Sequence, residues 1–148
     1  MKKNFIALLV VISLTPALWA QTKFALVIGN ENYIDITKLN NPVNDANDIA
    51  NVLEDLGFTV DKVLNGSLNQ MEEAVIRLKD RLSASGDSYG FFFYSGHGVQ
   101  SVGENYLLPV DANIPGENFL HNRALSMQAV LDALNSAANT LNIVILDA

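Results

Sequence analysis

Short apolar runs alternate along the chain with stretches in which apolar residues recur at helical spacing. The runs are rich in β-branched and aromatic residues and predict strands at Lys23–Ile28, Phe58–Leu64, Tyr89–Tyr94 and Asn142–Leu146. The stretches with helical spacing predict helices at Asn44–Leu56, Leu68–Leu82 and Ser126–Leu134. A further short run at Tyr106–Val110 predicts an exposed edge strand or one arm of a hairpin.

Two local signals support the helix boundaries. Ser67 and Gln70 have the spacing of a capping box, in which the hydroxyl and the amide each bind a free backbone N–H at the start of a helix. Gly57 follows the first predicted helix, at the position where a glycine commonly ends one.

The alternation of strands with helices predicts an α/β fold. Strands joined through helices lie mainly parallel in one sheet, with helices on both of its faces. We therefore expect a three-layer α/β/α sandwich. In such sheets the reactive groups gather in the loops at the carboxyl ends of the strands. Three of those ends are Gly29-Asn30, Ser95–Gly98 and Asp147-Ala148.

The N-terminus has the three-part pattern of a secretory signal peptide. A basic start precedes the apolar run Phe5–Leu14, and the segment ends on the small residue Ala20. We assign residues 1–20 to the signal peptide and residues 21–148 to a single domain, exported to the periplasm or the extracellular space. The apolar run is too short to span a bilayer, so no stable membrane span is expected after cleavage. An uncleaved anchor is the alternative interpretation.

Composition and charge narrow the function classes. With 49% hydrophobic residues, 9 Gly and 4 Pro, the chain does not resemble a disordered or collagen-like segment. Its 9 Lys and Arg against 16 Asp and Glu give a formal net charge of −7, which disfavours binding to the phosphate backbone of a nucleic acid. The same charge suits a cationic partner or ordinary solubility equally well.

The inventory of reactive residues is small. The sequence contains no cysteine, so it offers no disulfide, no thiolate metal site and no thiol nucleophile of its own. His97 and His121 are its two histidines, too few for a histidine-rich zinc site. The glycine motifs of dinucleotide-binding and P-loop proteins are also missing, so no nucleotide cofactor is expected.

His97 lies between two glycines directly after a predicted buried strand. An imidazole at this position would titrate near neutral pH and act as a base or an acid. The N–H of Gly98 is a candidate donor to a developing oxyanion. The alternative is a turn histidine with no chemical role, and the loop residue His121 is expected to be such a surface histidine.

Four segments carry sequence patterns of a known family. They are Phe24–Asn30, Leu39–Ala46, Tyr94–Gly98 and Ile143–Ala148. Together they resemble the caspase-like cysteine proteases, most closely the bacterial metacaspase-like group. In that family the catalytic cysteine directly follows an Asp-Ala pair like the one that ends this chain, about fifty residues after the histidine. The resemblance therefore implies a caspase-like α/β fold and the activity of a cysteine endopeptidase.

The resemblance also implies roles for individual residues. His97 would assist attack by the thiol and protonate the leaving amine, and the Gly98 N–H would contribute to the oxyanion hole. Asp45 and Asp147 match acidic residues that line the pocket for the side chain before the scissile bond, where two carboxylates would select Arg or Lys. The implied partners are protein or peptide substrates with a basic residue at that position. No cofactor or metal ion is implied.

Several of these residues also have a purely structural interpretation. Asp45 lies in the first turn of a predicted helix, where the helix dipole favours a negative charge. Asp147 at a strand end is a potential turn former. Asn30 is expected to stabilise its loop through bonds to the backbone, with no catalytic part.

The chain ends one residue before the position of the family's cysteine. We therefore expect a catalytic domain truncated at its C-terminus and predict that this polypeptide has no peptidase activity. In family members, further strands would cover the last predicted strand. The alternative is a catalytically dead caspase-like module, retained for binding in the cell envelope. A third interpretation, an α/β hydrolase with Ser95 as nucleophile, lacks the G-x-S-x-G elbow of that class.

Overall fold

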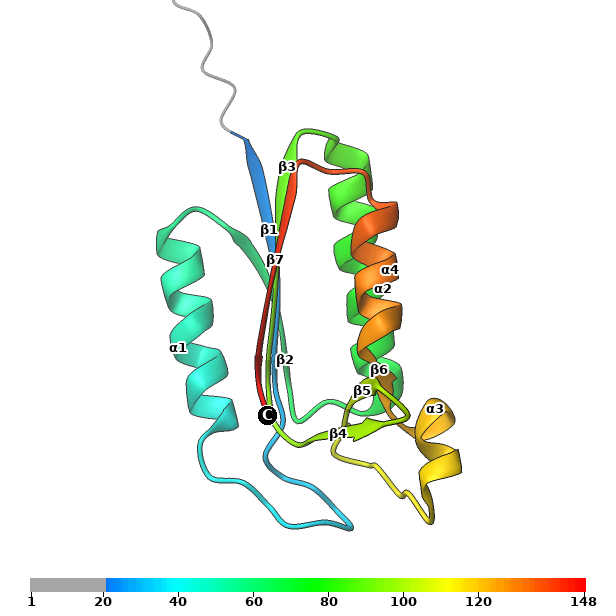
Figure 1. Cartoon of the computed structure of the whole chain (residues 1–148). Helices are drawn as coiled ribbons and strands as arrows, with labels where there is room; N and C mark the ends of the chain where they lie inside the picture. The colour runs from blue at the N-terminus through cyan, green and yellow to red at the C-terminus, as the bar shows by residue number, and fades with distance from the viewer. Residues whose placement is uncertain (1–20) are drawn as a thin grey trace, which may run out of the picture.

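The computed structural model describes residues 21–148, so the predicted signal peptide lies outside the described residues. At the centre of the domain is a sheet of four strands in the order β2-β1-β3-β7 (Figure 1). The strands are β1 (Thr22–Gly29), β2 (Thr59–Leu64), β3 (Ser88–Ser95) and β7 (Leu141–Asp147). Every pairing in this sheet is parallel, which confirms the predicted α/β class.

Helices cover both faces of this sheet and complete the three layers (Figure 1). They are α1 (Pro42–Asp55), α2 (Leu68–Ser85) and α4 (Met127–Ser136). α1 packs on β1, β2 and β3 from one side, whereas α2 and α4 lie together on the other. Gly57 follows α1 with a φ of 83°, a conformation that favours glycine. No helix among residues 21–148 combines the length and apolar character that a membrane crossing needs.

The two central strands supply side chains to two separate cores. Leu26 and Phe92 pack on the side of α2 and α4, whereas Val27 and Phe93 pack on the side of α1. Phe92 is fully buried. Both faces of β1 and β3 are covered, and this explains why their sequences read as continuous apolar runs rather than as alternating ones.

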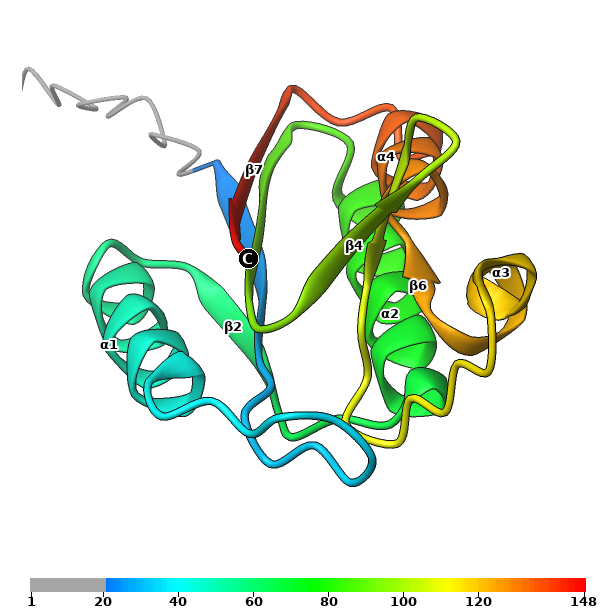
Figure 2. The same ribbon diagram turned by 60° about the horizontal axis from the view of Figure 1, so that its bottom comes forward.

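A second, antiparallel sheet lies beyond the carboxyl end of β3 (Figure 2). Its strands are β4 (Gly98–Ser101), β5 (Glu104–Leu107) and β6 (Leu125–Ser126), in the order β4-β5-β6. The hairpin arm predicted at Tyr106–Val110 is present as β5, although the strand begins two residues earlier and ends at Leu107. The expectation that it is exposed and lies at an edge was wrong: Tyr106, Leu107 and Leu108 are buried, because β4 and β6 flank β5 and α4 packs against it.

β4, β6 and two short helical segments were not predicted from the sequence. The helical segments are the 3-10 turn η1 (Glu117–Phe119) and α3 (Leu120–Arg123). β6 contains 2 residues and β4 contains 4. Segments this short are below the length at which hydrophobic periodicity identifies an element.

β7 forms one edge of the parallel sheet. It pairs with β3 on one side, and no strand among residues 21–148 pairs with the other. Ile143 and Ile145 are 42% and 43% exposed, on the face that α1 covers farther along the sheet. The described residues therefore leave one face of this apolar strand open.

The capping box predicted at the start of α2 is present. The Ser67 hydroxyl accepts the Gln70 N–H at 3.4 Å, and Gln70 Oε1 accepts the Ser67 N–H at 2.9 Å. We expect Ser67→Ala to lower the free energy of unfolding by about 1 kcal/mol, because an N–H in the first turn loses its partner. Denaturant titration measures the change. Ser83→Ala, in the last turn of the same helix, is the control, and an equal loss in both variants would contradict the capping role.

Candidate active site

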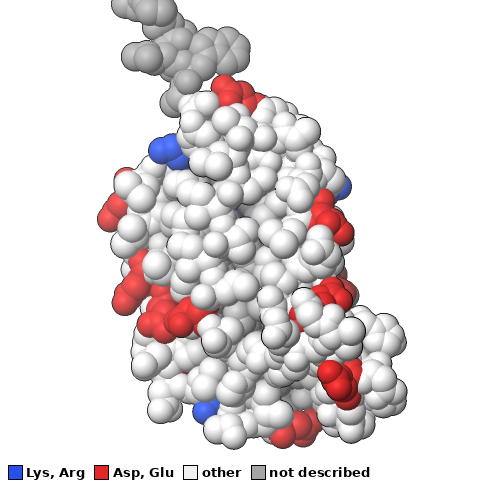
Figure 3. Space-filling model, viewed as in Figure 1, with Lys and Arg blue, Asp and Glu red and all other residues white. Residues whose placement is uncertain are grey.

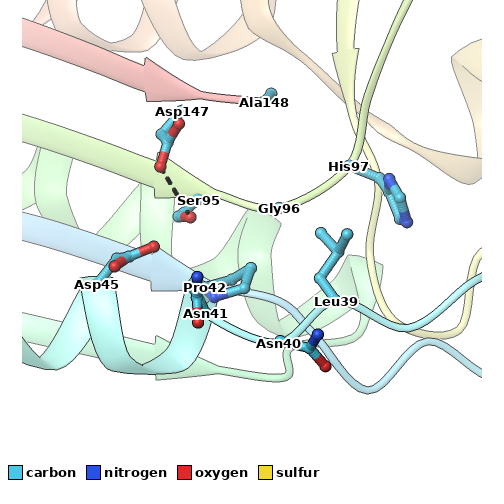
Figure 4. A pocket seen from close by; sticks show the side chains of 10 residues that line it. All are labelled: Leu39, Asn40, Asn41, Pro42, Asp45, Ser95, Gly96, His97, Asp147 and Ala148. Carbon is cyan, nitrogen blue, oxygen red and sulfur yellow. Dashed lines mark hydrogen bonds between the residues drawn. The ribbon is translucent and has the colours of Figure 1, made fainter.

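Three residues predicted from the sequence line one cleft at the carboxyl edge of the parallel sheet. His97 follows β3, Asp147 ends β7, and Asp45 lies in the first turn of α1. The cleft has a volume of about 400 Å³, and its walls also include Leu39, Asn40, Asn41, Pro42, Ser95, Gly96 and Ala148. Figure 4 shows the two carboxylates toward one end of the cleft and the imidazole toward the other.

The register of the parallel strands produces this convergence. Gly29, Ser95 and Asp147 are successive partners across β1, β3 and β7, so the three strands end level with one another. A Cβ on Gly29 would lie 2.5 Å from the carbonyl oxygen of Pro42. The first turn of α1 therefore sits directly against the end of β1, and this close approach brings Asp45 to the cleft.

The imidazole of His97 is fixed by the loop that joins β1 to α1. His97 Nε2 lies 2.7 Å from the carbonyl oxygen of Thr37. A carbonyl oxygen only accepts, so this contact requires the proton on Nε2 and leaves the lone pair on Nδ1. The ring also packs against Tyr33, with 4.7 Å between ring centroids. Thr37 was not singled out from the sequence, because its contribution is a main-chain atom that any residue can supply.

Two buried phenols lie against the main chain of His97. The Tyr33 hydroxyl accepts the His97 N–H at 2.7 Å, and the Tyr94 hydroxyl donates to the His97 carbonyl oxygen at 2.7 Å. Burial raises the pKa of both Tyr33 and Tyr94, so the phenols stay protonated. The sequence pattern placed Tyr94 in a strand and did not single out Tyr33, since only the fold brings them together.

Gly98 lies on the other side of Ala148. It lines an adjoining cleft with Ala148 and Leu146, and a Cβ on Gly98 would lie 3.0 Å from the Ala148 Cβ. The Leu108 N–H donates to the His97 carbonyl oxygen at 3.0 Å, so these two residues form a hydrogen-bonded pair. The two kinds of pair alternate along an antiparallel ladder, so the next pair of the β4–β5 ladder, Gly98 with Leu107, is a non-hydrogen-bonded one. The Gly98 N–H therefore points away from β5 and is free to donate to another acceptor.

The carboxylates of the cleft carry uncompensated negative charge. Neither Asp45 nor Asp147 takes part in an ion pair with another described residue. Asp147 Oδ2 accepts a hydrogen bond from the Ser95 hydroxyl at 3.4 Å. Such a cleft favours a cationic guest. Across residues 21–148, no three potential metal-ligating side chains come together.

Three further residues have the structural roles that their local sequence suggested or allowed. Asn30 is fully buried, donates to the Leu108 carbonyl at 3.1 Å and accepts the Gly66 N–H at 2.8 Å, so it ties three loops together. His121 is exposed on α3. Ser95 is 2% exposed and its hydroxyl donates to Asp147, which does not suit a nucleophile that must reach a substrate.

The sequence is similar to a family of known proteins and to individual relatives. The caspase domain family matches residues 22–148. The human mucosa-associated lymphoid tissue lymphoma translocation protein 1 is 33% identical to the chain over 128 residues, and its mouse homologue is 32% identical over 128 residues. Each match covers 86% of this chain and 15% of the length of the relative.

Proposed function

The chain belongs to the caspase domain family, and on that basis we propose that it supplies the acid–base half of a cysteine endopeptidase site. His97 is the general base and acid, and the nucleophilic thiol belongs to the residue position directly after Ala148. The observation that carries this proposal is that Ala148 lines one cleft together with His97 and a second with Gly98. A residue attached to Ala148 therefore starts between the imidazole and a free N–H donor.

The chemistry follows from the positions of these groups. His97 Nδ1 takes the proton of the thiol, and the sulfur attacks the carbonyl carbon of the scissile bond. The negative charge that develops on the carbonyl oxygen is stabilised by the Gly98 N–H and by the N–H of the cysteine itself. The Thr37 carbonyl, bound to Nε2–H, stabilises the imidazolium. The imidazolium then protonates the leaving amine, and a water molecule activated by Nδ1 hydrolyses the thioester.

We further propose that the substrate carries Arg or Lys before the scissile bond. Asp45 and Asp147 provide two carboxylates at the end of the cleft away from His97. A guanidinium or ammonium group there would form charge-assisted hydrogen bonds, whereas the carboxylate of an Asp substrate would be repelled.

Asp45→Asn tests this preference in a polypeptide that contains a cysteine directly after Ala148. We expect kcat/KM for an Arg peptide to fall roughly tenfold to a hundredfold, because one charge-assisted bond is lost. Hydrolysis of matched Arg and Asp peptides measures the change. Asp48→Asn, exposed one turn farther along α1, is the control. Faster cleavage of the Asp peptide by the unsubstituted protein would rule out the basic preference.

The 148-residue polypeptide contains no cysteine, and we propose that it does not itself hydrolyse peptides. The residue that follows Ala148 in the gene decides between two functions. A cysteine there favours the endopeptidase, to be verified by assaying the longer polypeptide on an Arg peptide. A stop codon there favours the catalytically dead binding module of the cell envelope.

We also propose that the protein is exported to the periplasm or the extracellular space. The basic start and the apolar run before Ala20 support this proposal. Mass spectrometry of the protein recovered outside the cytoplasm should find Gln21 as its first residue. A protein retained in the cytoplasm with Met1 intact would contradict it.

A further inference from the structure

The main chain of His97 is bound on both sides by side-chain hydroxyls. Its N–H donates to Tyr33 Oη at 2.7 Å, and its carbonyl oxygen accepts from Tyr94 Oη at 2.7 Å. The two phenol oxygens lie 3.2 Å apart. Tyr33 belongs to the loop after β1 and Tyr94 to β3, and both are almost completely buried. Two elements distant in sequence thus meet on one residue.

The protons of these groups can be assigned in a closed ring. A phenol has one proton to give. Tyr33 accepts from the His97 N–H and donates to Tyr94, and Tyr94 donates to the His97 carbonyl. The Leu108 carbonyl is a competing acceptor for both phenols, at 3.0 Å from Tyr94 Oη and 3.4 Å from Tyr33 Oη, and it already accepts Asn30 Nδ2–H. Each of these distances is longer than that of the ring bond which the same phenol donates. Each hydroxyl makes two of the three bonds, so its removal breaks these two, and the third loses the polarisation that they supply.

The glycine before His97 is required by the same two phenols. A Cβ on Gly96 would lie 2.6 Å from the Tyr94 hydroxyl and 2.7 Å from the Tyr33 hydroxyl. The space that a side chain would need is therefore taken by the pair of oxygens. The loop that contributes Tyr33 also contributes the Thr37 carbonyl that binds Nε2, so one segment holds both the main chain and the ring of His97.

We propose that Tyr33 and Tyr94 are positioning residues that hold His97 so that Nδ1 faces the cleft at the tip of β7. The inference rests on the proposed function only in naming Nδ1 as the base. Neither hydroxyl bonds to an imidazole nitrogen, although the Tyr33 ring packs against the imidazole with 4.7 Å between ring centroids. Their effect is to hold the backbone from which the imidazole projects, which keeps Nε2 on the Thr37 carbonyl and selects one tautomer.

The imidazole nitrogen signals of the ¹⁵N-labelled 148-residue chain test this role without any thiol. The chain contains two histidines, so the exposed His121 serves as an internal reference. We expect His97 of the unsubstituted chain to be in the Nε2–H form. In Tyr33→Phe and in Tyr94→Phe, each measured separately, the ring should become a mixture of tautomers. Hydrogen exchange at the His97 amide should accelerate roughly tenfold in Tyr33→Phe, the ratio expected when one hydrogen bond is lost.

Tyr89→Phe, at the opposite end of β3, is the matched control and should leave the His97 tautomer unchanged. Retention of the single tautomer in both test variants would overturn the proposal, as would a change in only one of them. An equal change at His121 would indicate general loss of structure and would also count against it. If a variant does not fold, hydrogen exchange in the unsubstituted chain tests the proposal. Rapid exchange of its His97 amide would overturn the proposal, because such exchange is incompatible with the closed ring.

The tautomer measurement and an assay of peptide cleavage test the positioning role and the proposed function independently. A single tautomer that depends on both phenols, in a protein whose longer form cleaves no peptide, would support the positioning role and remove the endopeptidase. An active enzyme in which both substitutions leave the His97 tautomer unchanged would support the endopeptidase and remove the positioning role.

Discussion

In a polypeptide that contains a cysteine directly after Ala148, His97→Ala is expected to lower kcat for cleavage after Arg by about 10²–10⁴-fold. The loss has this size because the imidazole acts twice, first as acceptor of the thiol proton and then as donor to the leaving amine. Thr37 and Tyr33 hold the ring in place for both steps. Initial rates on an Arg peptide measure the effect.

His121→Ala is the matched control, because it removes the second histidine from an exposed position on α3. It should retain the full rate. A similar loss in both variants would show that the assay reports stability instead of catalysis. An undiminished rate in His97→Ala would exclude the imidazole from the reaction.

Phe92→Ala is expected to lower the free energy of unfolding by about 3–5 kcal/mol. Phe92 is fully buried at the centre of the sheet, where it packs in the core shared by β1, α2 and α4. The substitution removes its apolar contacts and leaves a cavity that the surrounding elements fill only in part. Denaturant titration monitored by circular dichroism gives the value.

Ile34→Ala is the control for apolar truncation, since Ile34 is 73% exposed. Its effect should stay within about 0.5 kcal/mol. A loss below 1 kcal/mol in Phe92→Ala would mean that the core around β3 is not packed as described.

The central sheet was predictable because its strands are marked by their own sequences. β1 and β3 are buried on both faces, so their residues form continuous apolar runs, and the helices between them show a clear apolar stripe. The small antiparallel sheet was not predictable in the same way. The burial of Leu107 depends on β6, a 2-residue strand that arrives from far along the chain, and no local pattern encodes that pairing.

Some residues of the candidate site were predictable from the sequence and others were not. His97 and Asp147 follow from the rule that reactive groups lie where parallel strands end, because both lie within three residues of the end of an apolar run. Asp45 was reached only through the family resemblance, since its local sequence equally suits the first turn of a helix. The Thr37 carbonyl and the Tyr33–Tyr94 pair carry no sequence signal, because their contact with His97 exists only once the loop after β1 folds over β3.

The most direct test of the central claim is the pKa of a single cysteine placed directly after Ala148. The chain has no other thiol, so the pH dependence of alkylation reports the pKa of this cysteine alone. A thiol that faces the His97 imidazole should have a pKa at least about one unit below the ordinary value near 8.5, and His97→Ala should return it to that value. An ordinary pKa that is the same with and without His97 would show that the two groups do not face each other.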